Sequence, residues 1–214
     1  MQTLDLKKIH KSLFTASAKA PQLVEVPRLN FLRIDGAIEP GHGPSDSPRF
    51  AENLQALYGA SYTLKFMLKQ RAENPVDYPV MPLEGLWWVE DGRFDINIKD
   101  NWFYTVQIMQ PDMVTPDLFA EALAKLRKKK GEMEAFSRLR LEPFHEGLAV
   151  QMLHLGPYAA EPATVAKMDA YLQAEGLQKH GHHHEIYLGD PMRADPAKLK
   201  TILRHPVVKG SDIR

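Results

Sequence analysis

Apolar and polar positions along the chain follow two different periods, which alternate from one segment to the next. From Phe50 to Leu68 the apolar residues recur every three or four positions, a spacing that predicts one long amphipathic helix reaching about Lys69. Ser47 followed by Pro48 is typical of a helix start, because serine caps the first turn and proline fits its first position. We therefore expect a capped helix over 47–69.

Strand signals flank this helix on both sides. The run at 24–36 alternates apolar and polar residues and ends at a glycine, and the proline at position 27 places its start at a sheet edge. Two further strands are predicted within 78–89 and 102–109, the second being the strongest β signal in the chain. The Asp-Gly pair at 91–92 marks a turn between them.

The second half of the chain repeats these signals. Thr115 and Pro116 predict another capped helix, which ends before Gly131. The same criteria predict, in chain order, a strand at 136–141, a strand at 150–155, a helix that Pro162 opens and Gly176 closes, a strand at 183–188, and a last strand at 199–204 that Pro206 ends.

The order strand, helix, strand, strand therefore occurs twice, in about 24–110 and again in about 145–206, with a helical connection at about 115–141. Neither unit can bury both faces of its own strands, so the two should pair within one domain spanning 1–214. We predict an α+β fold of two duplicated modules with antiparallel sheets. A cleft shared between the modules is the expected ligand site.

Composition excludes several classes of protein. Lys and Arg together number 27, as do Asp and Glu, so the net charge is zero and no attraction to nucleic acid or acidic lipid is expected. There are no cysteines, which rules out disulfides and thiol chemistry. The first residues lack the apolar core of a signal peptide and no segment is long enough to cross a bilayer. We expect a cytoplasmic protein.

The strand at 183–188 carries the strongest candidate for chemistry. Side chains alternate along a strand, so Glu185 shares one face with His183 and Tyr187. Glutamate is depleted inside strands and is costly to bury, which favours a pocket that uses its charge. There it could attract a cation or act as a general base on water. The alternative is a surface carboxylate paired with Arg193 or Arg204.

The adjacent histidines at 182–184 invite a metal interpretation. Consecutive strand residues cannot all share a face, and neither a cysteine nor a His-x-x-x-His helix supports a site. Ordinary surface histidines explain the run better, with His183 as a partner for Glu185. We expect no metal and no cofactor.

Large aromatic residues supply candidate walls for a pocket. Trp102 and Tyr104 share one face of their strand, where ordinary sheet core is the competing explanation. The pair Trp87-Trp88 places one ring on each face of its strand, so one of the two should meet the ligand. We take Trp88, Trp102 and Tyr104 as candidate wall residues.

Several motifs together resemble the GyrI-like small-molecule-binding family, and more narrowly its stand-alone branch, which includes cyclopropanoid hydrolases. The resemblance covers about residues 5–208. It is carried by the sequences SYTLKFM at 61–67, PLEGLWW at 82–88, HLGPY at 154–158, EPAT at 161–164, and HHEIYL at 183–188 with Asp190-Pro191.

The resemblance implies a tandem pair of strand–helix–strand–strand (SHS2) modules around a cleft that holds a glutamate and aromatic walls. The matching positions here are Glu185 as catalytic residue and a ligand-binding set comprising Trp88, Trp102, Tyr104, Tyr158, His183 and Tyr187. Related domains are fused to DNA-binding regulators, but no room for such a domain precedes residue 24. The family's usual Lys-His-His-Glu is His-His-His-Glu here, and its Ser-Asp-Pro-Arg-Arg is Gly-Asp-Pro-Met-Arg, changes that affect the mouth of the site and not its acid.

Three functions follow as hypotheses. The protein could bind bulky, hydrophobic or cationic aromatic molecules; it could hydrolyse cyclopropanoid genotoxins in the same pocket, as a form of xenobiotic detoxification; or it could inhibit another macromolecule, as gyrase inhibitors do. The third would leave Glu185 dispensable. We expect a small-molecule ligand, no nucleic acid and no membrane, and leave the oligomeric state open.

Overall fold

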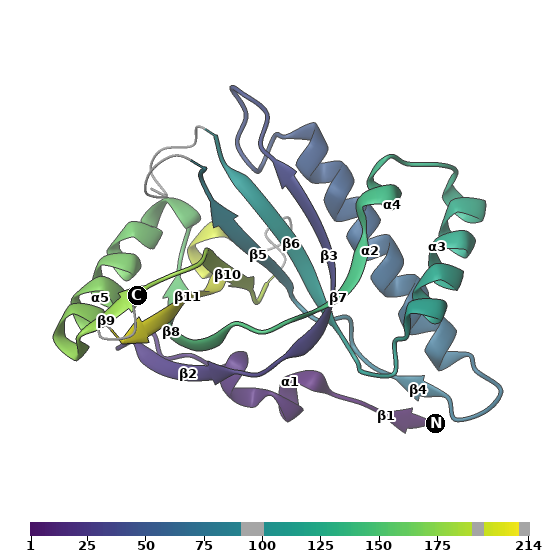
Figure 1. The fold of residues 1–214 in the computed structure, drawn as a ribbon, viewed down its shortest axis with the longest axis horizontal. Helices are drawn as coiled ribbons and strands as arrows, with labels where there is room; N and C mark the ends of the chain where they lie inside the picture. Colours follow the sequence, from purple (N-terminus) through teal and green to yellow (C-terminus); the bar gives the residue numbers. More distant parts are fainter. Residues whose placement is uncertain (91–100, 190–194, 210–214) are drawn as a thin grey trace.

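A computed structural model describes residues 1–90, 101–189 and 195–209 (Figure 1). The predicted turn at 91–92 and the Asp190-Pro191 pair lie outside the described residues. Within these ranges no helix is both long and apolar enough to cross a membrane. The architecture is α+β, as predicted, with one large antiparallel sheet and helices packed on it.

The three long helices form where their capping signals predicted. Helix α2 spans Pro48–Lys69, and the Ser47 hydroxyl accepts a hydrogen bond from the backbone N–H of Phe50 at 3.0 Å. Helix α3 spans Pro116–Lys130, with the Thr115 hydroxyl as its cap. Helix α5 spans Glu161–Glu175 and ends at Gly176, whose φ of +66° is the left-handed conformation that glycine adopts freely.

In the described residues the large sheet contains nine strands. Eight follow one path in the order β2-β8-β11-β10-β5-β6-β3-β7, and β9 pairs with β11 off this path. Their bounds are β2 Gln22–Val26, β3 Leu29–Ala37, β5 Leu83–Trp88, β6 Phe103–Gln110, β7 Arg140–Phe144, β8 Gly147–Leu155, β9 Leu177–Lys179, β10 His183–Tyr187 and β11 Lys200–Lys209. Short elements complete the fold: β1 Gln2–Thr3 pairs with β4 Val76–Asp77, and α1 Leu6–Ile9 and α4 Ala135–Arg138 are single turns.

The strand order reads alike from both sides of the central β5–β10 pair. In the first half the chain runs β3, α2, β5, β6, and in the second half β8, α5, β10, β11. These elements occupy mirrored places in the sheet, since β3 and β8, β6 and β11, and β5 and β10 stand at equal distances from its centre. The order of elements agrees with the predicted repeat, whereas the structural duplication of the two modules stays a prediction.

The two faces of this sheet are covered differently. Helix α2 packs on β3 and β6, and α5 packs on β8, so both lie on one side, which we call the helical face. The other side, the N-terminal face, is crossed by residues 12–17, where Leu13 O accepts from Arg204 and Ser12 O accepts from Gln151. A large apolar core surrounds α2, and a smaller cluster that includes Met152 and Met168 lies under α5.

Three strand predictions need correction. The predicted strand at 24–36 is two strands, because Pro27 lacks a backbone N–H and the chain leaves β2 there to begin β3 beside other partners. The predicted strand at 136–141 is instead the turn α4 followed by β7. Pro206 does not end the last strand: its carbonyl accepts from His180 N–H at 3.0 Å, and β11 continues along β9 to Lys209.

Candidate functional site

Strand β10 lies at the centre of the sheet between β11 and β5. Its side chains alternate as predicted, so that His183, Glu185 and Tyr187 point to the helical face. His184 points to the N-terminal face, where Glu84 and Glu146 contact it. The two faces of one short strand therefore present two separate groups of polar side chains.

Glu185 is buried, with 6% of its surface exposed. His183 Nε2 lies 3.3 Å from Glu185 Oε1, and the Tyr187 hydroxyl is hydrogen-bonded to the same carboxylate. Tyr187 also accepts a hydrogen bond from Trp87 Nε1 at 3.0 Å. Burial first, and then the negative charge of Glu185, raises the pKa of Tyr187 well above its ordinary value. Tyr187 therefore remains a hydrogen-bond donor to Glu185.

This burial contradicts the alternative of a surface carboxylate. Arg204 extends from the other face of the sheet, where its guanidinium contacts Gln151 and Glu146. Arg193 lies outside the described residues. Within the described part of the chain, the basic side chain in contact with Glu185 is that of His183.

A glycine in the neighbouring strand makes room for these partners. Gly85 is directly opposite Glu185 in the β5–β10 register. A Cβ atom at this position would lie 2.7 Å from Trp87 Nε1 and 3.1 Å from the Tyr187 hydroxyl, distances too short for an unstrained contact. The absence of a side chain at Gly85 therefore lets the indole and the phenol meet over the strand.

A second carboxyl group, Glu161, faces Glu185 from the first turn of α5. It is 1% exposed, and neither of its oxygens has a hydrogen-bond partner among the residues that the structure describes. Burial first, and then the charge of Glu185, raises the pKa of Glu161 well above its usual range. Sequence reasoning noted Glu161 only within a motif, because an acidic residue in the first turn of a helix is ordinarily an exposed one.

Tyr158 belongs to the same group of side chains. It lies in a 3₁₀ turn, Tyr158–Ala160, just before α5, and its ring meets that of Tyr187 edge-on at 5.9 Å between centroids. Burial, followed by the charges of Glu185 and Glu161, raises the pKa of Tyr158 to about 12. Tyr158 is 37% exposed, so part of its side chain meets solvent while its ring contacts Tyr187.

Trp87, and not the predicted Trp88, is the tryptophan of β5 on the face of Glu185. Trp87 pairs with His183 in the register of β5 and β10, so it shares the face of Glu185. Trp88 is turned to the other side, where it stacks on His182 at 4.3 Å between ring centroids. Alternation predicted one ring on each face but did not say which face would be which.

The other two predicted wall residues extend the aromatic cluster away from Glu185. Trp102 lies 5.5 Å from Trp87 and Tyr104 lies 5.7 Å from it, both measured between ring centroids. Tyr104 is fully buried and its hydroxyl accepts from Asn53 Nδ2 at 2.9 Å. It packs against Phe50 of α2 as part of the core, which agrees with the competing explanation for this stripe.

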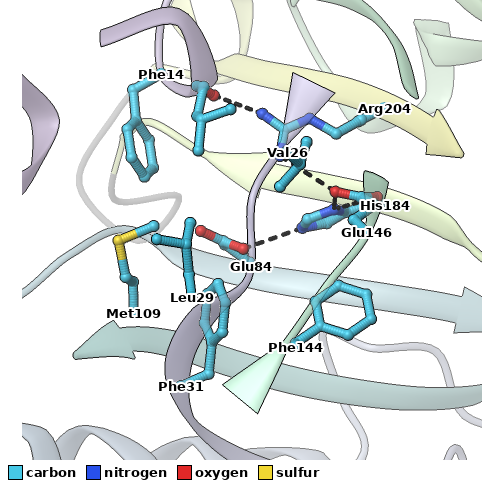
Figure 2. Close-up of a pocket in the computed structure, with 11 residues that line it drawn as sticks. Phe14, Val26, Leu29, Phe31, Glu84, Met109, Phe144, Glu146, His184 and Arg204 are labelled. Carbon is cyan, nitrogen blue, oxygen red and sulfur yellow. Dashed lines mark hydrogen bonds and ion pairs between the residues drawn. The ribbon is translucent and has the colours of Figure 1, made fainter. Parts of the chain in front are cut away.

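The N-terminal face of β10 holds a network of paired charges (Figure 2). His184 Nδ1 lies 2.9 Å from Glu146 Oε1, and its Nε2 lies 3.1 Å from Glu84 Oε2. Arg204 Nη1 donates to Glu146 at 3.4 Å, and Gln107 Nε2 donates to Glu84 at 3.0 Å. Glu146 therefore lies beside His184 and Arg204, and Glu84 lies beside His184 and Gln107.

The network shifts the pKa values of His184 and Glu146 in opposite directions. Burial alone would lower the pKa of His184, but Glu146 and Glu84 outweigh it and raise that pKa to about 9. Burial alone would raise the pKa of Glu146, but His184 and Arg204 lower it to about 2. The imidazolium and the carboxylate are thus both charged at neutral pH.

A small cavity adjoins this network (Figure 2). Its volume is about 10 Å³, and its walls are mostly apolar side chains, including Phe14, Phe31 and Phe144. That space suffices for about one water molecule and not for an aromatic ligand. In the described ranges, no group of three or more His, Asp or Glu side chains is placed to hold a metal ion.

Comparison with known proteins adds three solved structures and one family. Residues 20–207 match the GyrI-like small-molecule-binding domain. An uncharacterized conserved protein from Listeria innocua is 41% identical, with a TM-score of 0.86 over 96% of this chain and 100% of that chain. Two proteins of Listeria innocua described as hydrolases are 37% and 38% identical, with TM-scores of 0.80 and 0.83 over 96% and 97% of this chain and 100% of theirs. No curated protein matches the sequence.

Proposed function

Because the chain belongs to the GyrI-like small-molecule-binding family, we propose that it binds an aromatic small molecule on the helical face of β10 and hydrolyses it with Glu185 as general base. The observation that carries this proposal is the burial of Glu185 among aromatic rings, with a hydrogen bond from Tyr187 and with His183 Nε2 at 3.3 Å from its Oε1. The description of two relatives as hydrolases supports the catalytic half.

The aromatic side chains suit a flat ligand. Trp87 and Tyr187 lie on the same face as the carboxylate, and Tyr158 lies above them with part of its ring exposed. A ligand would reach Glu185 by displacing the Tyr158 ring from its edge-on contact with Tyr187. Aromatic rings that pack face or edge against such a ligand would hold it, while the phenol hydroxyls supply polar contacts.

A strained ring is a substrate that this set of groups can open. Glu185 removes a proton from water, and the water oxygen attacks a cyclopropane carbon conjugated to a dienone. The carbon–carbon bond breaks, its electron pair moves through the conjugated system, and the carbonyl oxygen becomes a phenolate that takes up a proton from solvent, while Glu185 returns the proton it removed to solvent. Tyr158 keeps its proton at neutral pH and would donate a hydrogen bond to that developing oxyanion. The sum of these steps is the addition of one water molecule.

Its neighbours would prepare Glu185 for this task. The Tyr187 hydroxyl, which accepts from Trp87, donates to the carboxylate, and the His183 ring lies 3.3 Å from it. A base held in one orientation loses less freedom when it reacts. Tyr187 and His183 are therefore positioning residues in this proposal.

The second candidate is a binder that sequesters aromatic cations without reaction. It is favoured by the proximity of Glu161 to Glu185, because among the described residues no Lys or Arg side chain forms an ion pair with either carboxyl. A cation would supply the missing positive charge. In this case Glu185 contributes affinity and not turnover.

The two candidates are separated by product analysis. A cyclopropaindolone alkylator is incubated with the protein, and mass spectrometry follows the gain of one water. We expect turnover by the wild type and a loss on the order of 10²–10⁴-fold in Glu185→Gln, which keeps the shape but removes the base. Glu175→Gln, an exposed change at the far end of α5, is the matched control. Binding without product would leave the sequestering function.

A further inference from the structure

We infer that Glu161 and Glu185 hold a single proton between them, and that an aromatic cation entering the site displaces this proton. This inference rests on the proposed binding site. The site would then exchange a proton for a cation, while a neutral aromatic ligand would leave the proton in place. Binding of a cation would then release a measurable number of protons, which binding to Glu185 alone does not require.

The hydrogen-bond partners place this proton on Glu161. Glu185 accepts a hydrogen bond from Tyr187 and has the His183 ring at 3.3 Å, so one donor already faces it. Glu161 has no such donor among the described residues, although it is 1% exposed. An ionised carboxylate without water or donors is far costlier to bury than a neutral carboxylic acid. Of the two groups, Glu161 is thus the one that stays neutral.

Among the described residues, no Lys or Arg side chain forms an ion pair with Glu161. From β10 it is faced by Glu185 and Tyr187, and from the 3₁₀ turn by Tyr158. On β8, His154 is occupied by Thr164 and by the carbonyl of Pro157. On β9, Lys179 forms an ion pair with Asp169, two turns further along α5.

The start of α5 acts in the opposite direction but only weakly. The partial positive charge at a helix N-terminus favours ionised groups in the first turn, where Glu161 lies. It is opposed by nearly complete burial and by the negative charge of Glu185. Burial without a hydrogen-bond donor and the charge of Glu185 both favour the neutral form of Glu161, so the pair retains one proton.

Exchange follows from charge balance. The free site is Glu161–COOH with Glu185–COO⁻. A monocation L⁺ binds Glu185, lowers the cost of ionising Glu161, and the products are two carboxylates around L⁺ and one H⁺ in solution. Binding that releases one proton strengthens about tenfold for each unit rise in pH, as linkage requires. A neutral ligand shows no such dependence.

The test uses a matched pair of probes, 10-methylacridinium and neutral acridine, at pH 8. Titration calorimetry in phosphate and in Tris gives the number of protons released, because the two buffers differ in ionisation enthalpy. We expect about one proton released for methylacridinium and none for acridine. Between pH 7 and pH 8 the affinity for methylacridinium should rise about tenfold.

Two variants test whether Glu161 is the group that holds the proton. Glu161→Gln mimics the neutral acid, so it should fold, bind acridine as before, and bind methylacridinium without releasing a proton. Glu175→Gln on the same helix should behave as the wild type. Release that persists in Glu161→Gln, or cation binding by the wild type without release, overturns the inference. Failure of both probes to bind contradicts the proposed site itself.

A measurement without ligand makes the test independent of the probes. Infrared spectra at pH 8 should show the C=O band of a protonated buried carboxyl in the wild type and in Glu175→Gln. The band should be missing in Glu161→Gln. Its absence from the wild type would show that Glu161 is ionised, and the inference would be wrong whatever the probes do.

Discussion

Glu185 and His184 are consecutive residues of one strand and both are almost fully buried. Their charged neighbours on the two faces of the sheet nevertheless differ. On the N-terminal face His184 lies between Glu84 and Glu146, and Arg204 completes the balance of charge. On the helical face two carboxyls, Glu185 and Glu161, are buried, and His183 is the basic side chain that contacts Glu185 within the described ranges.

This difference distinguishes a charge network that stabilises the fold, on the N-terminal face, from a candidate ligand site on the helical face. Buried charges with matched partners hold elements in place, and here they tie the β7–β8 turn, β10 and β11 together. A buried carboxyl without a donor contributes nothing to the fold and costs stability. Such a group is retained for its chemistry or for a ligand, and the contrast can be tested face by face.

The largest effect on stability should follow from breaking the network on the N-terminal face. Glu146→Ala leaves both His184 and Arg204 short of their common partner, and removal of one member of a buried ion pair costs about 3–5 kcal/mol. Urea denaturation measures this loss. The matched change on the other face, Glu161→Gln, should leave the protein as stable or more so. Equal losses for the two variants would erase the distinction between the faces.

The two faces should also differ in their dependence on pH. The pKa of Glu146 is about 2 when folded, against an ordinary value of 4.5, so its contribution is present above pH 4.5 and is lost as the pH falls toward 2. This shift corresponds to roughly 3 kcal/mol. The pKa of His184 is about 9, against 6.5, so its contribution is complete below 6.5 and is lost as the pH rises through 9. Denaturation midpoints measured from pH 2 to pH 9 follow both the loss of stability at low pH and the loss at high pH.

Glu161 should change the dependence of stability on pH in the direction opposite to Glu146. Its pKa is raised in the folded protein, so the folded state holds a proton that the unfolded chain releases above pH 4.5. Its cost to stability therefore grows with pH above that point. The stability gained by Glu161→Gln should be larger at pH 8 than at pH 5, and a gain that is independent of pH would contradict a protonated Glu161.

A smaller effect is expected from closing the space opposite Glu185. Gly85→Ala forces a methyl group against Trp87 and Tyr187, a crowding that costs about 1–3 kcal/mol and separates the indole from the phenol. Tryptophan fluorescence and urea denaturation follow the two consequences. Gly189→Ala, with no atom within 4 Å of the added carbon, is the control. An unchanged Gly85→Ala protein would show that the Trp87–Tyr187 contact does not depend on this glycine.

Local signals in the sequence determined the helices and the alternation along β10. Ser47-Pro48 and Thr115-Pro116 set helix starts because a side-chain cap and a fixed φ act within one turn. The sharing of one face by His183, Glu185 and Tyr187 needs only the period of a strand.

Only the tertiary structure decided what these faces meet. Period two relates Trp87 to Trp88 but does not say which of them joins Glu185, because that depends on the register with β10. The pairing of Glu146 with His184, and the position of Glu161 opposite Glu185, join residues 38 and 24 positions apart through turns and a helix crossing. No local propensity encodes such contacts, since they are set by how the strands assemble and how α5 packs on the finished sheet.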